Sequence, residues 1–352
     1  MRTQNLKIGI THGDINGIGY EIILKTLSEN YITDLCVPIV YGSSKIAAYY
    51  RKNIGLENFS FNLIKHPSEA NLKRPNLINV LTDEYKAEPG IPSPTSGKAA
   101  FISLERATED LKRGLLDAIV TAPIDKHAIK SANFDFIGHT EFLQQKFGSQ
   151  NVLMFLISEN LKIATVTNHV PLQEVKSLIN TSIILEKLKI LNQSLIKDFG
   201  ITKPKIAILG LNPHAGDNGI IGKEENEIIV PALKLAREEK IMAMGPYPAD
   251  GFFASLSYKK FDAVLSMYHD QGLIPFKLLS FETGVNFTAG LQVIRTSPAH
   301  GTAFDIADKN MANPSSFRHA LYAAIDIYKK RMEYAEYTKN PVETIKKEST
   351  NE

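Results

Sequence analysis

The chain has 352 residues, 43% of them hydrophobic and 22% charged, which is an ordinary composition for a globular enzyme. Its 40 basic and 38 acidic residues leave a net charge of +2, which gives no reason to expect a basic face for nucleic acid. Cys36 is the one cysteine, so no internal disulfide can form, and no apolar run approaches the ~20 residues of a membrane span. The first ten residues also lack the apolar core of a signal peptide. We therefore expect a cytoplasmic protein with neither nucleic-acid nor membrane partners.

Short apolar runs alternate with amphipathic stretches along the chain. We expect strands within residues 6–14, 36–43, 117–123, 161–170, 205–213 and 261–270. Their near-continuous apolar character is typical of strands that are covered on both faces. Apolar residues recur at helical spacing in 96–114 and 314–335, whereas the Pro- and Gly-rich segment 88–97 predicts a surface loop. The alternation predicts an α/β protein with a parallel or mixed sheet flanked by helices, and the length predicts two lobes.

Polar residues stand where the expected strands end. Ligands bind beyond the carboxyl ends of strands in open α/β sheets, so we expect these residues to gather at one edge. They are Asp14, Asp125, His169, Asn212, His214, His269 and Asp270. The glycines near Asp14, in GDINGIGYE, do not fit the spacing G-x-G-x-x-G of a dinucleotide-binding turn.

Three of the strand-end residues are histidines: His169, His214 and His269. Neutral imidazole is a common ligand of divalent metals, and three such ligands leave coordination positions open for water or substrate. The gaps of 45 and 55 residues are too long for a helical motif, so the fold would have to bring the rings together. The alternative to a metal site is that these histidines have only structural roles.

Two aspartates are further candidates for the site. Asp250 and Asp270 could be acid–base residues or could orient an imidazole, and the alternative is a role in a helix cap or turn.

A second set of residues suggests an anion site. Lys277, Asn286 and Arg295 lie in otherwise apolar segments, where a cation is costly unless an anion accompanies it. Surface side chains that extend to solvent are the alternative. Backbone donors and the hydroxyl of Gly138-His139-Thr140, which opens an expected helix, could also face an anion. Finally, SPAHGTAFDIADKNMANP (297–314) suits a loop that lets a flat ring approach the backbone.

These blocks carry a resemblance. The chain resembles the 4-hydroxythreonine-4-phosphate dehydrogenase family along nearly its full length. The matching blocks are THGDINGIGYEI, TAPIDKHAI, GHTEFL, NHVPL, LNPHAGDNGIIGKEE, GPYPAD, YHDQGLIPFK and GVNFTAGLQVIRTSPAHGTAFDIA. The loop HGTAFDIADKNMANP is also similar to the adenosine-binding loop of isocitrate and isopropylmalate dehydrogenases, whose fold the family shares, and this would explain the missing glycine fingerprint. The sequence departs from the family pattern at Ile15 and Tyr20, where prolines are common, and at Asp308, where a glycine is common.

The resemblance implies a two-lobed isocitrate/isopropylmalate dehydrogenase-like fold with the active site in the cleft between the lobes. Residues 1–130 with 272–340 would form the cofactor-side lobe, 131–271 the metal, substrate and dimerisation lobe, and 341–352 a flexible tail. A homodimer would share each metal site across its interface. The implied residues are metal ligands His169, His214 and His269; substrate contacts His139, Thr140, Lys277, Asn286 and Arg295; cofactor contacts His300, Gly301, Thr302 and Asp305; and catalytic groups Asp250, Asp270 and Lys277.

The family reaction is the oxidation by NAD of the hydroxyl on carbon 3 of 4-phosphooxy-L-threonine. Loss of carbon dioxide then gives 3-amino-2-oxopropyl phosphate, a precursor of pyridoxal 5′-phosphate. The divalent metal could be zinc, magnesium or cobalt, because three-histidine sites accept several metals. A dehydrogenase of D-erythronate 4-phosphate or D-threonate 4-phosphate would keep the same motifs. A metal hydrolase and a ligand-sensing protein are more distant alternatives, because they leave the adenosine-type loop or the metal and anion residues without a role.

Overall fold

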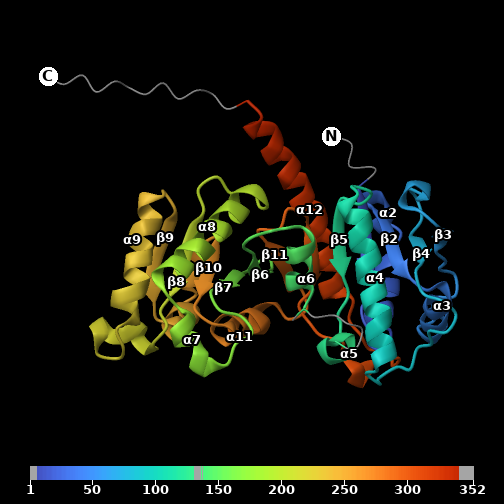
Figure 1. Ribbon diagram of the computed structural model, residues 1–352, viewed down its shortest axis with the longest axis horizontal. Coiled ribbons are helices and arrows are strands. Elements are labelled where there is room, and N and C mark those ends of the chain that lie inside the picture. The colour runs from blue at the N-terminus through green and yellow to red at the C-terminus, as the bar shows by residue number, and fades with distance from the viewer. Residues whose placement is uncertain (1–5, 131–135, 137, 341–352) are drawn as a thin grey trace.

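The computed structural model describes residues 6–130, 136 and 138–340, which form one sheet of twelve strands with helices on both faces (Figure 1). In sheet order the strands are β3 (Asn62–Ile64), β4 (Asn76–Asn79), β2 (Val37–Gly42), β1 (Lys7–Thr11), β5 (Ala118–Thr121), β12 (Arg295–Pro298), β11 (Val285–Ala289), β6 (Leu153–Ile157), β7 (Lys162–Thr165), β10 (Ala263–Ser266), β8 (Lys205–Leu209) and β9 (Met242–Tyr247). The α-helices are α1 (Gly19–Leu27), α2 (Ile32–Leu35), α3 (Ser44–Asn53), α4 (Pro94–Lys112), α5 (Lys126–Lys130), α6 (His139–Lys146), α7 (Leu172–Leu178), α8 (Thr181–Lys197), α9 (Val230–Glu238), α10 (Ala249–Ala254), α11 (His269–Ser280) and α12 (Ser315–Thr338).

The predicted α/β class, with a mixed sheet flanked by helices, is confirmed. Each predicted strand run contains one observed strand, and the two predicted helices correspond to α4 and α12. The strands are shorter than the runs because the apolar residues continue into the turns behind them. The predicted flexible tail, 341–352, lies outside the described residues. No helix in the described ranges is both long enough and apolar enough to cross a membrane.

The direction of the strands reverses at the centre of the sheet. Strands β1, β2, β4, β5 and β12 run parallel, β11 is antiparallel to both of its neighbours, and β6 is antiparallel to β7. Three reversals between β12 and β7 make the outer halves of the sheet run in opposite directions. In sheet order, β1 and β5 therefore run in the opposite direction to β7 and β10. Residues that follow β5, β7 and β10 nevertheless line one cavity, namely Lys126, His169 and His269. The expectation that the strand-end residues gather is therefore met by His169 and His269, whereas Asp14, Asn212 and His214 lie outside this cavity.

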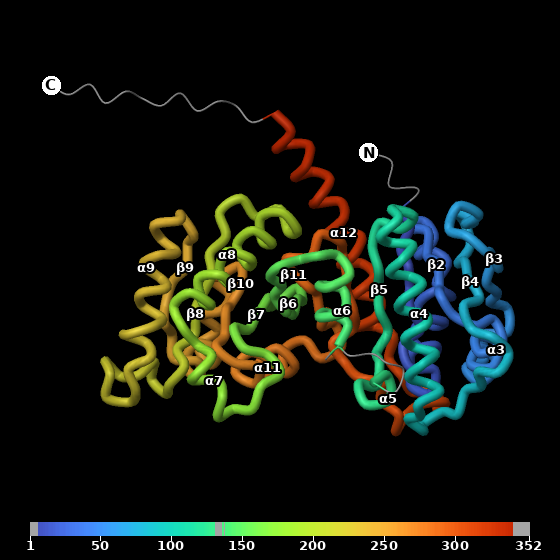
Figure 2. Tube along the Cα trace, viewed as in Figure 1, coloured from blue at the N-terminus to red at the C-terminus, as the bar shows by residue number. Residues whose placement is uncertain are grey.

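The two parts of the chain form the two halves of the sheet. Figure 2 shows the blue-to-teal elements on one side, the green-to-orange middle of the chain on the other, and the red helix α12 between them. Residues of the predicted cofactor-side lobe form β1–β5 and β12, while 131–271 supply β6–β10. Strand β11 also belongs by sequence to the cofactor-side lobe, but it lies between β12 and β6 in a continuous sheet. The proposed lobe boundary therefore falls within the hydrogen-bonded strands rather than in a linker.

The two faces of the sheet are covered differently. On one face a single apolar core runs from β4 to β8 beneath α1, α12, α8 and α9. On the other face the apolar residues form separate clusters, one under α10 and α11 and two under α4 and the neighbouring α5 and α6. Because side chains alternate along a strand, Phe155, Val285 and Phe287 enter the continuous core, and Leu156 and Asn286 lie on the interrupted face.

A ring stack stabilises the first turn of the chain, where Ile15 and Tyr20 replace the family's prolines. His12 stacks on Tyr20 with ring centroids 5.3 Å apart, and Tyr20 stacks on Tyr50 at 5.7 Å. The Tyr20 hydroxyl accepts a hydrogen bond from the Ser43 backbone N–H (2.8 Å), and the Tyr50 hydroxyl donates to the Ile15 carbonyl (2.7 Å). Aromatic packing thus fixes the turn that a proline would otherwise stiffen.

Buried His12 should make the protein acid-labile. Burial lowers its pKa from 6.5 to about 4, although its bond to the Gly13 carbonyl opposes the effect. The unfolded chain therefore takes up this proton first as pH falls below 6.5. The stability lost between 6.5 and about 4 should reach about 3 kcal/mol. Urea unfolding at pH 7.5, 6 and 5 measures the loss.

A His12→Gln variant that folds should lose less stability over this pH range than the wild type. The exposed His127→Gln variant is the matched control and should keep the wild-type pH dependence. Identical slopes for His12→Gln and the wild type would contradict the assignment.

Candidate active site

A cavity of about 300 Å³ opens on the interrupted face of the sheet, where β6, β11 and β12 meet α6 and α11. Most of the polar residues predicted for the site line it. The lining residues are Ile124, Lys126, Gly138, His139, Thr140, Glu141, Met154, Leu156, His169, His269, Leu273, Lys277, Asn286, Arg295, Pro298, Ala299 and His300. All five predicted substrate contacts and two of the three predicted metal ligands are therefore brought together, although they come from segments far apart in the sequence.

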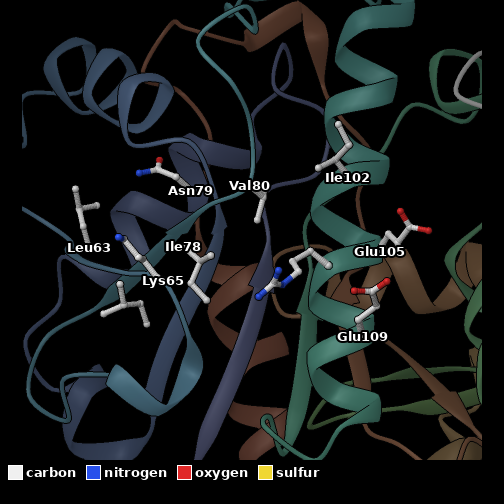
Figure 3. Close-up of a pocket in the computed structure, with 10 residues that line it drawn as sticks. Leu63, Lys65, Ile78, Asn79, Val80, Ile102, Glu105 and Glu109 are labelled. Atoms are coloured by element: carbon white, nitrogen blue, oxygen red, sulfur yellow. The ribbon is translucent and has the colours of Figure 1, made fainter.

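A larger groove, of about 760 Å³, lies elsewhere, between β3, β4 and α4 (Figure 3). It contains charges of both signs, including Lys65, Glu105 and Glu109. Its Arg106 is already paired with Asp110 on the same helix, at 3.3 Å. None of the residues predicted for the site lies in this groove, so its size gives no reason to prefer it.

Arg295 is the most unusual charge in the cavity. Its side chain is 3% exposed, and its Nε and Nη2 donate to the Thr121 hydroxyl at 3.1 and 2.9 Å. No carboxylate of the described residues pairs with it. Burial lowers its pKa to about 10, and the more distant Glu141 only partly opposes this. A buried guanidinium with hydroxyl partners but no counter-charge is costly, and a bound anion would offset that cost.

Several neutral groups in the cavity lack partners within the described chain. Burial, reinforced by Arg295 and Lys126, holds the pKa of His139 well below 6.5, so its ring is neutral. The Nε2 atoms of His139 and His300 and the Oδ1 of Asn286 make no hydrogen bond to the described residues. Buried polar atoms are rarely left unpaired, so these atoms indicate a missing polar ligand.

His169 and His269 form a pair at the mouth of the cavity. Their ring centroids lie 5.7 Å apart. His269 Nδ1 donates to Asp270 Oδ1 at 2.7 Å, which leaves the lone pair of Nε2 free to bind a metal. Desolvation, followed by the charge of Lys126, lowers the pKa of His169 and favours its neutral, ligating form. Asp270 lines an adjacent hollow, also of about 300 Å³, that contains both histidines as well.

His214 and Asp250 do not line the cavity of their own chain. His214 is exposed on the turn Pro213–Gly219, and Asp250 is exposed in the first turn of α10. Within the described residues of one chain, no three His, Cys, Asp or Glu side chains are close enough to hold a metal. The pair His169–His269 therefore fits a divalent metal only if further ligands come from water, substrate or a second chain.

The predicted cofactor loop packs against the first turn of the chain. The Thr302 carbonyl accepts from the Ile18 backbone N–H at 3.0 Å, and a Cβ on Gly17 would lie 2.7 Å from the same oxygen. Only glycine permits this approach. Asp308, where the family has a glycine, adopts φ +63°, and its carboxylate accepts hydrogen bonds from Tyr49 and Asn53. These bonds offset the strain of the left-handed backbone.

Three strand-end residues hold loops instead of facing the cavity. Asp14 accepts from the Asn16 backbone and the Ser96 hydroxyl, and Asp125 accepts from the first backbone N–H groups of α5. The side chain of Asn212 donates to two glutamates, Glu224 and Glu225. In contrast, Lys126 and Glu141 line the cavity but were not predicted. Both lie in the family-like blocks TAPIDKHAI and GHTEFL, directly beside the predicted residues Asp125 and Thr140.

Comparison with known proteins identifies the family. The family model described as "Pyridoxal phosphate biosynthetic protein PdxA" matches residues 34–324. The chain belongs to this family. Among PdxA relatives, a 4-hydroxythreonine-4-phosphate dehydrogenase of Bacteroides thetaiotaomicron is 50% identical over 343 residues, covering 97% of this chain and 94% of that protein. Another, of Sulfurihydrogenibium sp., is 43% identical and covers 91% and 98%. The resemblance carried by the sequence blocks is thereby confirmed.

Solved structures agree with this family fold. The crystal structure of 4-hydroxythreonine-4-phosphate dehydrogenase from Klebsiella pneumoniae superposes with a TM-score of 0.80 at 36% identity, covering 93% of this chain and 99% of that one. The structure from Burkholderia phymatum gives 0.76 at 37% identity, covering 92% and 98%. The arrangement of one mixed sheet with a central reversal is therefore that of a PdxA protein.

A pair of buried arginines provides a test of the anion site. Replacing Arg295 by Met removes an unpaired buried charge, so the ligand-free protein should keep its stability or gain some. Arg331 is the matched control: it is 7% exposed and pairs with Asp198 at 2.7 Å. Arg331→Met leaves that carboxylate buried and unpaired, which should cost about 3–5 kcal/mol.

Urea unfolding gives the stability of both variants, and the shift of the melting temperature in inorganic phosphate reports the anion site. Phosphate should stabilise the wild type and Arg331→Met, but not Arg295→Met. A loss of 3 kcal/mol or more in ligand-free Arg295→Met would mean that the arginine is structural.

Proposed function

We propose that the chain oxidises the carbon-3 hydroxyl of 4-phosphooxy-L-threonine with NAD, and that the product loses carbon dioxide to give 3-amino-2-oxopropyl phosphate. The relatives' names support the substrate class. The single observation that carries the proposal is Arg295, a buried cation without a carboxylate partner in the described chain, on the floor of a cavity that also contains Lys126 and Lys277. Such a cavity suits a small substrate with several negative charges.

Different residues of the cavity would bind different groups of the substrate. Arg295 and Lys277 would hold the phosphate and the carboxylate, and Asn286 and neutral His139 would satisfy further oxygens without adding charge. These contacts would fix the reacting carbon relative to the cofactor. The two reactants then need not meet by diffusion in the correct orientation, which lowers the barrier. Lys277 and Asp270 line the cavity or its mouth and are the better placed of the three proposed catalytic groups. Asp250 would need a second chain to bring it to the site.

The histidines would hold a divalent metal, with zinc, magnesium and cobalt all compatible. When bound, such an ion supplies Lewis acidity, which lowers the pKa of the substrate hydroxyl and stabilises the negative charge left by decarboxylation. His169 and His269 would contribute from one chain, and His214 from its partner. Asp270 keeps the ring of His269 in the tautomer that can ligate.

The loop from His300 to Asp305 would take the adenosine part of NAD, which acts as the hydride acceptor. Its carbonyl contact with Ile18 and the close approach at Gly17 support a preformed loop. His300 belongs both to this loop and to the cavity lining, so the loop and the substrate site are adjacent. We expect Gly301, Thr302 and Asp305 to contact the cofactor.

A homodimer is supported by the apolar surface beside the site. Helix α11 carries His269 and Lys277, and it also exposes Ile274 (58%), Leu278 (82%) and, at its end, Phe281 (72%). Ile220, next to the His214 turn, is 80% exposed. Neighbouring apolar side chains of this size at a soluble surface usually mark an interface. A second copy on this face would cover them and could supply the missing ligand.

A substrate panel tests the reaction. Purified protein with NAD and a divalent metal should produce reduced nicotinamide from 4-phosphooxy-L-threonine, and much less from D-erythronate or D-threonate 4-phosphate. Lys277 is exposed in the ligand-free chain, so Lys277→Ala should weaken substrate binding by about 1 kcal/mol through the loss of a charged contact, while NAD binding is retained. A preference for a sugar-acid phosphate would assign the chain to the alternative activity.

Hybrid dimers test whether the metal site is shared. Because His169 and His269 lie together in one chain, coexpressed His169→Ala and His214→Ala subunits should form one intact site and recover part of the activity. His214→Ala with His269→Ala should do the same. His169→Ala with His269→Ala should remain inactive. If heterodimers form and no combination recovers activity, each site lies within one subunit.

A further inference from the structure

The turn that carries His214 has an unusual backbone. Residues 214–218 all lie in the left-handed region, with φ values of 54°, 50°, 80°, 42° and 55°. One of the five, Gly216, is a glycine; the other four are L-residues whose Cβ makes this conformation unfavourable. Such a run persists only when the surrounding structure enforces it. Its effect is to project His214 outward at the end of β8.

Glu225 holds the segment that leads into the turn and lies against Gly216 within it. Its side chain is buried, with the residue 2% exposed, at the start of the π-helical turn Glu225–Ile229. Its Oε1 accepts from the backbone N–H groups of Leu211 (2.8 Å) and Asn212 (2.7 Å), and its Oε2 accepts from Asn212 Nδ2 (2.9 Å). One carboxylate thus satisfies three donors of the segment that leads into the turn.

Two glycines let the chain wrap around this carboxylate. A Cβ on Gly216 would lie 2.5 Å from Glu225 Oε2, and a Cβ on Gly210 would lie 3.1 Å from Oε1. The turn is therefore fitted to a carboxylate at this position. The exit of β8 is also tied to the other histidines, because Gln271 Nε2 donates to the Gly210 carbonyl (2.6 Å) and its Oε1 accepts from the Met267 N–H (2.7 Å) just before His269.

We propose that Glu225 is a positioning residue for the metal ligand His214. It acts through the left-handed turn and touches neither metal nor substrate, and the proposal rests on the proposed function of His214 as a ligand. A carboxylate is suited to this place because it only accepts hydrogen bonds, and Leu211 and Asn212, just before the turn, donate three to it. Glutamine at this position would turn an NH₂ donor toward one of these donors.

Cobalt binding to metal-free dimeric protein tests the proposal. Glu225→Gln and Gly216→Ala should each weaken Co²⁺ binding at least about tenfold, the scale known for residues that orient metal ligands. Calorimetry gives the affinity, and the visible spectrum of bound Co²⁺ reports its ligand geometry. Hydrogen exchange of segment 211–222 should become faster in both variants while the rest of the chain keeps its protection.

Glu227→Gln is the matched control, because Glu227 is exposed on the same π-helical turn and should change none of these readouts. If Glu225→Gln fails to fold, the cobalt affinity of Gly216→Ala still tests whether the turn positions His214. The two assignments fail separately. If His214→Ala binds cobalt as tightly as the wild type, the metal assignment is wrong. If His214→Ala loses affinity but Glu225→Gln keeps it, only the positioning role is overturned.

Discussion

The reversal of strand direction at β11 and β6 organises the whole molecule. A continuous apolar core beneath α1, α8, α9 and α12 stabilises one face of the sheet across this reversal. On the opposite face, α10 and α11 cover one side of the reversal, and α4, α5 and α6 cover the other. The cavity lies between these two groups of helices. Strand alternation then fixes which side chains enter the cavity: Leu156 and Asn286 do, whereas their neighbours Phe155 and Phe287 enter the core. The site is thus a consequence of how the sheet is covered.

The two buried arginines show how similar groups serve different purposes. Arg331 joins α12 to the end of α8 through Asp198, and its Nη1 donates to the Gln292 carbonyl, so its charge is balanced within the fold. Arg295 is buried equally deeply, yet its partners are hydroxyl groups of Thr121 and Thr288. The fold therefore carries the cost of an uncompensated charge at the place where an anionic substrate would neutralise it. Such a cost is expected at a binding site and not in a structural core.

Sequence reasoning succeeded with residues whose chemistry conflicts with their surroundings. Asn286 and Arg295 are polar residues in otherwise apolar segments of the sequence, and both line the cavity. Sequence reasoning failed where a residue is ordinary in its local context. Lys126 resembles any lysine at the start of a helix, and Glu141 any acidic residue in a first turn, yet both line the cavity. Conversely, Asp14 and Asn212 look exposed and functional at strand ends, but their side chains are occupied by backbone and side-chain donors that only the folded loops supply.

The sequence by itself determined six of the twelve described strands, the helices α4, α6 and α12, the α/β class and the chemical types available to the site. These follow from hydrophobic periodicity and residue chemistry, which are local properties. The tertiary structure alone decided the order of the strands, the central reversal and the partners of each polar group, because β6 and β11 pair although they are far apart in the chain. It also decided that His169 and His269 meet within one chain while His214 lies outside their cavity. His214 stands on a left-handed turn beside the buried Glu225, and a backbone of this kind leaves no periodic signal in the sequence.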